Sequence, residues 1–352
     1  MDLKSLLQSL GIIAVIFTLV PFVAADYWWI RIFDYPHVQL TVFTLVTFLI
    51  YFFRFDIRSW RDYVFVGILA VCFVFQLLKI YPYTPFADVK AMENENVDPE
   101  NSLSILAANV LQKNKHHQKL LDEILRTSPD LIILTETDEI WEKAISPALQ
   151  NRYPYQVKEP LDNTYGILLY SSYPLIGAEV RYLVNDTIPS IHGIIKLPSG
   201  QKVQLHAIHP TPPMPQENPS SSDRDAEMMM VAKMARNSKL PVVVTGDFND
   251  VAWSHTTSLF IKASELLDPR MGRGFFNTFN ANSWLMRWPL DHLFISEEFR
   301  VVELERGEDI ESDHFPLYSE ISFEPEVAAE QEQKPPSPEV LKEANKQIKK
   351  VK

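Results

Sequence analysis

Three nearly charge-free apolar runs occupy most of the first 80 residues: Leu6 to Ala25, Val38 to Phe53 and Tyr63 to Ile80. Each approaches the roughly 20 residues that a helix needs to cross a bilayer. Three successive runs with short polar joints are hard to bury in a soluble core, so we predict three transmembrane helices. For the first run taken alone, a cleaved signal peptide is the alternative. Aromatic residues typical of the membrane interface flank the runs, namely Tyr27, Trp28, Trp29, Tyr35, Tyr51 and Trp60.

The joints between the runs differ in basic residues. The joint after the second run holds Arg54, Arg58 and Arg61, whereas the joint after the first holds Arg31. Lys4 adds a positive charge near the N-terminus. Because basic loops tend to stay in the cytoplasm, we predict a multi-pass inner-membrane protein with everything after the third run outside the cytoplasm, in the periplasm of a bacterium.

Composition divides the chain into four parts. Residues 1–81 form the predicted membrane anchor, and residues 82–100 mix prolines with acidic residues in the manner of a linker. Residues 101–324 form the main domain. Residues 325–352 are rich in Pro, Glu, Gln and Lys, which predicts a disordered charged tail, apart from a short helix that can start at Ser337.

The main domain alternates strand-like and helical patterns. Apolar strands such as "SLSILAAN", "DLIILT" and "PVVVTGD" are separated by helical segments, and "IHGIIKL" with "KVQLHAI" reads as a hairpin. This order predicts an α/β domain with both parallel and antiparallel pairings. The domain holds 20 Lys and Arg against 30 Asp and Glu, a balance of −10. Such a composition is poorly suited to following a polyanion's backbone.

Polar side chains recur where the predicted strands begin or end, and such edges commonly bind ligands. Taken singly, each has a structural explanation as a helix cap, a turn former or a satisfied histidine. Jointly they describe a site for a hard cation with acid and base groups, in which Glu136 and Asp313 suit Mg²⁺ or Mn²⁺. The set comprises Asn109, Glu136, His209, Asp247, Asn249, Asp291, Asp313 and His314.

Seven motifs in this region resemble those of the endonuclease/exonuclease/phosphatase superfamily. In chain order they are "NVLQKN", "PDLIILTE", "HAIHPTPP", "SDRDAEMMM", "GDFNDVAWS", "PLDHLFIS" and "SDHFP". The pair Gly-Asp-Phe-Asn and Ser-Asp-His is the most specific. The resemblance implies a DNase I-like four-layer α/β sandwich, in which two packed sheets are flanked by helices. The Trp-Ser after the fifth motif and the predicted anchor are similar to those of bacterial membrane-attached members.

The resemblance also implies roles for five oxygen-bearing residues. Glu136 would be the principal metal ligand, with Asn109 and Asp313 on the metal or its waters; Asn109 would also contact substrate. Asp247 would orient or deprotonate the attacking water, and Asn249 would hydrogen-bond the phosphorane.

Four further residues receive roles in the same way. His314 would contact the scissile phosphate, with Asp291 fixing its tautomer. His209 would lie on the phosphate side as a candidate to assist the leaving oxygen. Arg224 would grip phosphate, or would form a structural ion pair instead.

The expected activity is metal-dependent phosphoester hydrolysis. The substrate can be a nucleic acid, a nucleotide or a lipid headgroup, and the motifs do not choose among them. The alternatives are a phosphodiesterase or phosphatase acting on lipid headgroups or inositol phosphates, and a non-catalytic binding module tethered to the membrane. Apart from the membrane, the sequence indicates no protein partner.

Overall fold

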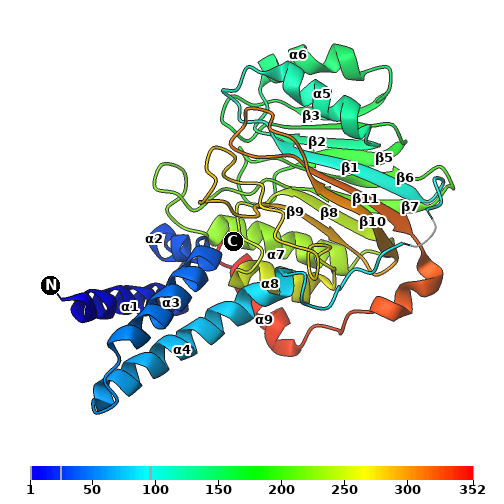
Figure 1. Cartoon of the computed structure of the whole chain (residues 1–352). Coiled ribbons are helices and arrows are strands. Elements are labelled where there is room, and N and C mark those ends of the chain that lie inside the picture. Colours follow the sequence, from blue (N-terminus) through cyan, green and yellow to red (C-terminus); the bar gives the residue numbers. More distant parts are fainter. Residues whose placement is uncertain (1, 24–25, 95–96, 352) are drawn as a thin grey trace.

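The computed structural model of the chain describes residues 2–23, 26–94 and 97–351. Residues 24–25, at the end of the first apolar run, and residues 95–96, in the expected linker, therefore lie outside the described part, as do the first and last residues. Within that part, an N-terminal group of helices projects from a larger domain built on two sheets (Figure 1).

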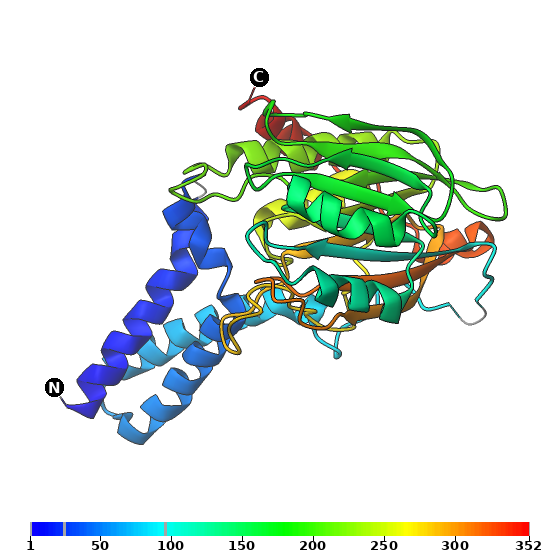
Figure 2. The ribbon, with the colours of Figure 1, turned by 90° about the horizontal axis from the view of Figure 1, so that it is seen from above.

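The N-terminal helices are α1 (Leu3–Leu19), α2 (Trp28–Arg31), α3 (His37–Tyr51) and α4 (Trp60–Ile80). With their short 3-10 extensions, the segments Leu3–Val23, His37–Arg54 and Trp60–Tyr83 are long and apolar enough to cross a membrane. Figure 2 shows that the chain's N-terminus lies at the end of this group far from the domain. The start of α3 and the end of α4 therefore lie beside the domain.

The larger domain contains two mixed sheets. The first has the order β10-β11-β1-β2-β4-β3 and the second the order β5-β6-β7-β8-β9. The strands are β1 (Ser102–Asn109), β2 (Leu131–Thr135), β3 (Tyr155–Glu159), β4 (Ile167–Ser171), β5 (Leu175–Arg181), β6 (Ser190–Lys196), β7 (Lys202–Ala207), β8 (Val242–Asp247), β9 (Asp291–Ile295), β10 (Phe299–Arg306) and β11 (Leu317–Phe323).

Three apolar clusters fill the spaces between the layers of the domain. Alternate strand residues from both sheets, such as Ile133 and Val243, form the central core between them. The outer face of the first sheet packs on α5 (His117–Thr127) and α6 (Glu139–Leu149). The outer face of the second packs on α7 (Ser222–Arg236) and α8 (His255–Ser264). The result is the expected four-layer sandwich preceded by three long apolar helices.

The C-terminal segment corrects the expectation of a disordered tail. Residues Pro325–Gln331 form a 3-10 helix (η5), and Pro338–Ile348 form helix α9. Ala344 and Ile348 of α9 are buried in the same cluster as α7 and α8, and half-buried Val340 packs against it. These apolar residues recur every four positions along one helix face, a stripe that average composition conceals because the other faces are charged.

The expected linker is also packed rather than free. Ala91 is buried in the core between the sheets. The backbone N–H of Asn94 donates a hydrogen bond to the backbone carbonyl of Val301 at 2.9 Å. The described residues of this segment therefore lie along the domain instead of spacing it from the helices.

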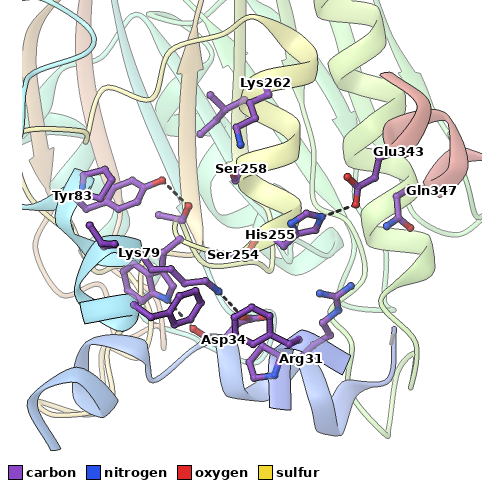
Figure 3. A pocket seen from close by; sticks show the side chains of 18 of the residues that line it. Arg31, Asp34, Lys79, Tyr83, Ser254, His255, Ser258, Lys262, Glu343 and Gln347 are labelled. Atoms are coloured by element: carbon purple, nitrogen blue, oxygen red, sulfur yellow. Dashed lines mark hydrogen bonds and ion pairs between the residues drawn. The ribbon is translucent and has the colours of Figure 1, made fainter. Parts of the chain in front are cut away.

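The helical group is fastened to the domain at several points. The indole of Trp253 donates to the carbonyl of Asp34 at 2.7 Å, and the hydroxyl of Tyr83 donates to the carbonyl of Ala252 at 2.6 Å. Beside these contacts the junction contains a cavity of about 650 Å³, and on its N-terminal side Lys79 pairs with Asp34 at 3.6 Å (Figure 3). Both hydrogen bonds are made by residues of the loop after β8, so the N-terminal region supports this loop at two points.

Candidate active site

Strand register brings the candidate residues to one edge of the two sheets. Asn109 pairs with Thr135 across the parallel strands β1 and β2, so Glu136 follows directly beside it. Asp247 lies opposite Asp291 across the antiparallel strands β8 and β9. Because β1 and β8 pack against each other across the core, the two pairs converge.

Local backbone geometry at the end of β8 explains why the motif begins with glycine. Gly246 has a φ of +135°, and a Cβ at this position would lie 2.1 Å from the carbonyl oxygen of Ile208. Asn249 (φ 51°) and Glu136 (φ 58°) also adopt the left-handed conformation that non-glycine residues rarely occupy. Such conformations concentrate at functional sites, where the surrounding structure enforces them.

Asp247 lies at the centre of the cluster. Its Oδ1 accepts a hydrogen bond from the amide of Asn249 at 2.9 Å. Its Oδ2 lies 3.0 Å from Asn109 Nδ2, 3.7 Å from His209 Nε2 and 3.6 Å from His314 Nε2. One buried carboxylate is thus shared by two imidazoles and an amide.

Asn109 bridges two carboxylates. Its Nδ2 donates to Glu136 Oε1 at 2.8 Å as well as to Asp247, while its Oδ1 accepts from the amide of Leu111 at 3.0 Å. The amide therefore presents its nitrogen to the two carboxylates. The bridge brings two acidic groups close together, and such convergence favours a cation.

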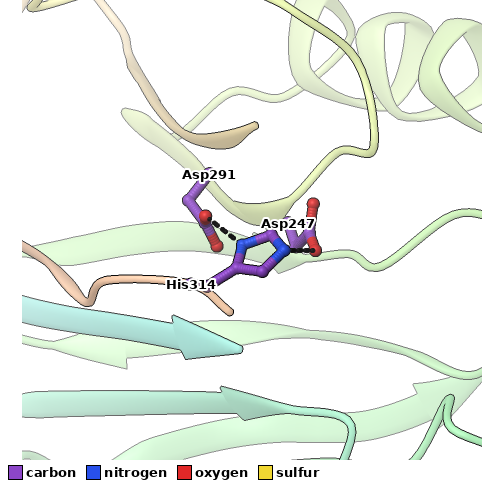
Figure 4. A group of neighbouring side chains, drawn as sticks. All are labelled: Asp247, Asp291 and His314. Carbon is purple, nitrogen blue, oxygen red and sulfur yellow. Dashed lines mark hydrogen bonds and ion pairs between the residues drawn. The ribbon is translucent and has the colours of Figure 1, made fainter. Parts of the chain in front are cut away.

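Asp291 and His314 form the tightest pair. The Nδ1 atom of His314 lies 2.7 Å from Asp291 Oδ2, and the ring stands between Asp291 and Asp247 (Figure 4). Burial disfavours the imidazolium, but the carboxylates of Asp291 and Asp247 outweigh it and raise the pKa of His314 to about 10. Burial also raises the pKa of Asp291. Both ring nitrogens face carboxylates, which favours the doubly protonated imidazolium form of His314.

The same three residues form a group of donors that can hold a metal ion, with ligand atoms within 4.8 Å of one another. This group differs from the expected set of Glu136, Asp313 and Asn109. Glu136 and Asp313 line the adjoining cleft, and burial raises the pKa of Glu136, an effect that nearby His209 opposes. Oxygen donors predominate among the described residues of the cluster, so the chemistry of the site fits Mg²⁺ or Mn²⁺.

Asn249 and His209 lie at the side of the cluster. Asn249 lines the cleft, and its Nδ2 donates one hydrogen to the carbonyl of Pro210 at 3.0 Å, which leaves a second amide hydrogen. His209 lies 5.3 Å from the ring of Tyr165, measured between centroids. Both positions are compatible with contact to a ligand in the cleft.

Arg224 does not line the cleft. Its guanidinium is buried, lies 2.9 Å from Asp225 and 3.2 Å from Asp250, and donates to the carbonyl of Asn249 at 2.8 Å. Of the two expectations for this residue, the structure shows the ion pair. Arg224 instead supports the backbone of the loop that presents Asn249.

Sequence reasoning missed four aromatic residues that line the cleft. They are Tyr35, Tyr165, Phe279 and Trp288. Tyr35 carried a signal as an interfacial aromatic beside an apolar run, but its hydroxyl donates to the carbonyl of Asn249 at 2.8 Å. Trp288 directly precedes the "PLDHLFIS" motif. Nothing in the local sequence of Phe279 indicated that its ring would lie 4.9 Å from that of His314.

Comparisons with known proteins agree with this architecture. Similar solved structures include the human Nocturnin catalytic domain (17% identity, TM-score 0.51), covering 64% of this chain and 96% of that one. An endonuclease/exonuclease/phosphatase family protein from Bacteroides thetaiotaomicron is 19% identical, with TM-score 0.51 and the same coverage. D. rerio TDP2, complexed with a single-strand DNA product, is 16% identical with TM-score 0.51, covering 63% and 99%.

At such low sequence identities, the structural similarity shows only that the fold is shared. No curated protein matches the chain. The model of the Endonuclease/Exonuclease/phosphatase family matches residues 101–314, which is more than half of the chain and includes every candidate residue. The chain therefore belongs to the endonuclease/exonuclease/phosphatase family.

Proposed function

We propose that the chain is a membrane-anchored phosphoester hydrolase that depends on Mg²⁺ or Mn²⁺. The observation that best supports this function is a cleft floor that contains Glu136 and two buried histidines, His209 and His314. The buried carboxylates of Asp247 and Asp291 lie directly behind these histidines. Buried acids with altered pKa values beside imidazoles are typical of catalytic centres.

The proposed metal ligands are Glu136 and Asp313, with Asn109 holding the Glu136 carboxylate in place. A bound divalent cation would polarise the phosphoryl oxygens and offset negative charge. The proposal draws on the cleft position of the two acids and on the absence of any paired cation for Glu136 among the hydrogen bonds and ion pairs of the described residues.

Asp247 is the proposed general base. It accepts a proton from water while the water oxygen forms a bond to phosphorus and the bond from phosphorus to the leaving oxygen breaks. His209, which lines the cleft, supplies a proton to the departing alcohol. The second amide hydrogen of Asn249 and the imidazolium of His314 stabilise the added charge on the phosphorane. Asp291 orients His314 and holds its proton on the ring.

The test is metal-dependent hydrolysis of p-nitrophenyl phosphate and methyl p-nitrophenyl phosphate by the full chain in detergent. We expect EDTA to abolish the reaction and Mg²⁺ or Mn²⁺ to restore it. Glu136→Gln should raise the Mg²⁺ concentration for half-maximal rate at least about tenfold. Glu139→Gln, an exposed acid three residues away, is the control. Activity that survives EDTA, or equal Mg²⁺ dependence of the two variants, would reject the proposal.

The anchored topology is a separate part of the proposal. Lys4, Arg54, Arg58 and Arg61 favour the cytoplasm for the end of the helical group remote from the domain. The domain would then lie in the periplasm or outside the cell. Periplasm-dependent and cytoplasm-dependent reporters fused after Lys352 test this orientation: activity of the cytoplasmic reporter alone would reverse it.

A further inference from the structure

The cleft above the acidic cluster has a polar floor and apolar walls. Its volume is about 420 Å³, and its floor contains Glu136, His209, Asn249, Asp313 and His314. The walls are mostly apolar and are contributed by Ile32, Pro36, Pro212, Pro213, Met214, Met286, Trp288 and Leu290, with the aromatic Tyr35, Tyr165 and Phe279. Thr164 and Glu217 are the polar members of the lining outside the floor, and Glu217 accepts a hydrogen bond from the hydroxyl of Tyr165. A ligand that fills this space needs a polar end at the floor and an apolar portion along the walls.

An unbroken aromatic series joins the floor of the cleft to the N-terminal helical group. The ring of His314 lies 4.9 Å from that of Phe279, which stacks on Trp288 at 5.9 Å between centroids. Trp288 in turn meets Tyr35 edge to face at 5.6 Å. The apolar surface therefore continues from the reacting end of the cleft to the N-terminal helical group.

The anchor itself supplies one wall. Ile32, Tyr35 and Pro36 lie between helices α2 and α3, at the end of the helical group next to the domain. Tyr35 also reaches the catalytic loop through its hydrogen bond to the carbonyl of Asn249. If α1 and α3 cross the membrane as proposed, this segment lies at the bilayer surface, where aromatic side chains are favoured.

An exposed apolar loop reaches the same level. Trp284 is 86% exposed, and Leu285 and Met286 follow it with large exposed surfaces. The carbonyl of Leu285 accepts a hydrogen bond from Gln39 Nε2 at 2.7 Å, and Gln39 lies in the first turns of α3. Because this loop is hydrogen-bonded to the start of a membrane-spanning candidate, its exposed apolar tip is positioned to contact lipid.

Charge argues against a polynucleotide in the cleft. No Lys or Arg occurs among the lining residues in the described part of the chain. Nucleic-acid backbones are bound through arrays of basic side chains, and aromatic stacking normally supplements them. An apolar wall without cations suits a hydrocarbon chain better than a second phosphate.

We propose that the substrate is an amphiphilic phosphoester, a phosphate ester with a long hydrocarbon chain, taken directly from the bilayer. Its phosphate reaches the floor of the cleft while the chain lies along Ile32, Met286 and Trp288 towards the membrane. The anchor is then part of the substrate site and not only a tether. This inference rests on the proposed hydrolase function.

The experiment compares alkyl p-nitrophenyl phosphates that share one scissile bond and one leaving group. The probes are the methyl, octyl and hexadecyl esters, assayed with the full chain in nanodiscs and Mg²⁺. We expect kcat/KM to rise at least about tenfold from methyl to octyl, and further to hexadecyl, because each added apolar contact strengthens binding. Ile32→Ser and Trp288→Ala should reduce the octyl-to-methyl ratio by about tenfold or more.

The ratio of two rates does not depend on how much protein is folded, so a partly misfolded variant still gives an answer. Leu125→Ser, an exposed apolar residue on α5 (74%), is the matched control and should keep the wild-type ratio. Equal kcat/KM for methyl and octyl esters in the wild type, or an unchanged ratio in both cleft variants, would overturn this inference and leave the hydrolase function intact. If the wild type hydrolyses none of these esters and no p-nitrophenyl phosphate either, the result would instead reject the hydrolase function.

Discussion

A buried acid on α7 should make the stability of the domain depend on pH. Glu227 is 3% exposed, and its Oε1 has no hydrogen-bond partner among the described residues. Burial, with a smaller contribution from nearby Asp223, raises the pKa of Glu227 from 4.5 to about 8. The carboxyl is therefore protonated in the folded chain at neutral pH and ionised in the unfolded chain.

The sign and size of the effect follow from linkage. Below pH 4.5 both states are protonated and Glu227 contributes no pH dependence. Between pH 4.5 and about 8 the unfolded state loses the proton first, so the free energy of unfolding falls by about 1.4 kcal/mol per pH unit. At pH 7 this titration therefore makes the free energy of unfolding about 3 kcal/mol lower than it is below the pKa of the unfolded state.

Glu227→Gln removes this titration while keeping the side-chain shape. The difference in unfolding free energy, variant minus wild type, should grow by about 1.4 kcal/mol per unit from pH 5 to pH 8. Guanidinium unfolding of the full chain in detergent, followed by tryptophan fluorescence, measures this difference. Glu139→Gln, on the exposed face of α6, should give a flat difference. A flat difference for Glu227→Gln as well would refute the reasoning.

Three further substitutions test the site and its support. Asp291→Asn should lower the pKa of His314 well below about 10, because the largest counter-charge is removed while burial still disfavours the imidazolium. Ring ¹⁵N shifts of the metal-free protein report this change, and an unchanged titration would contradict it. Tyr35→Phe should lower kcat about fivefold through the lost hydrogen bond to the Asn249 carbonyl, which Arg224 still supports. The control is Tyr182→Phe, at an exposed tyrosine whose hydroxyl donates to Glu159 and which does not line the cleft, and it should leave kcat unchanged. Gly246→Ala should destabilise the domain by about 3 kcal/mol or more, seen in denaturant unfolding, because its Cβ would meet the Ile208 carbonyl at 2.1 Å.

Much of the fold could be predicted because its strands are short apolar runs that end in polar motifs. The positions of Glu136, Asp247 and His314 at one edge followed from that pattern, and the structure brings them together. The packing of α9 could not be read from composition, since three apolar residues on one helix face do not change the average polarity of a charged segment.

The part of the site that escaped sequence reasoning depends on contacts between distant segments. Tyr35 and Asn249 are separated by more than 200 residues, yet a hydrogen bond joins them. Arg224 has a charge suited to phosphate, and only the positions of Asp225 and Asp250 reveal that its guanidinium is already paired. Such pairings follow from the packing of whole layers, which local patterns of hydrophobicity do not specify.

The most direct test of the central claim is the kcat of Asp247→Asn on methyl p-nitrophenyl phosphate with saturating Mg²⁺. The amide keeps the shape of the carboxylate but cannot accept the proton of the attacking water, so we expect kcat to fall by about 10²- to 10⁴-fold while thermal unfolding shows a folded domain. A folded Asp247→Asn protein with the kcat of the wild type would contradict the account.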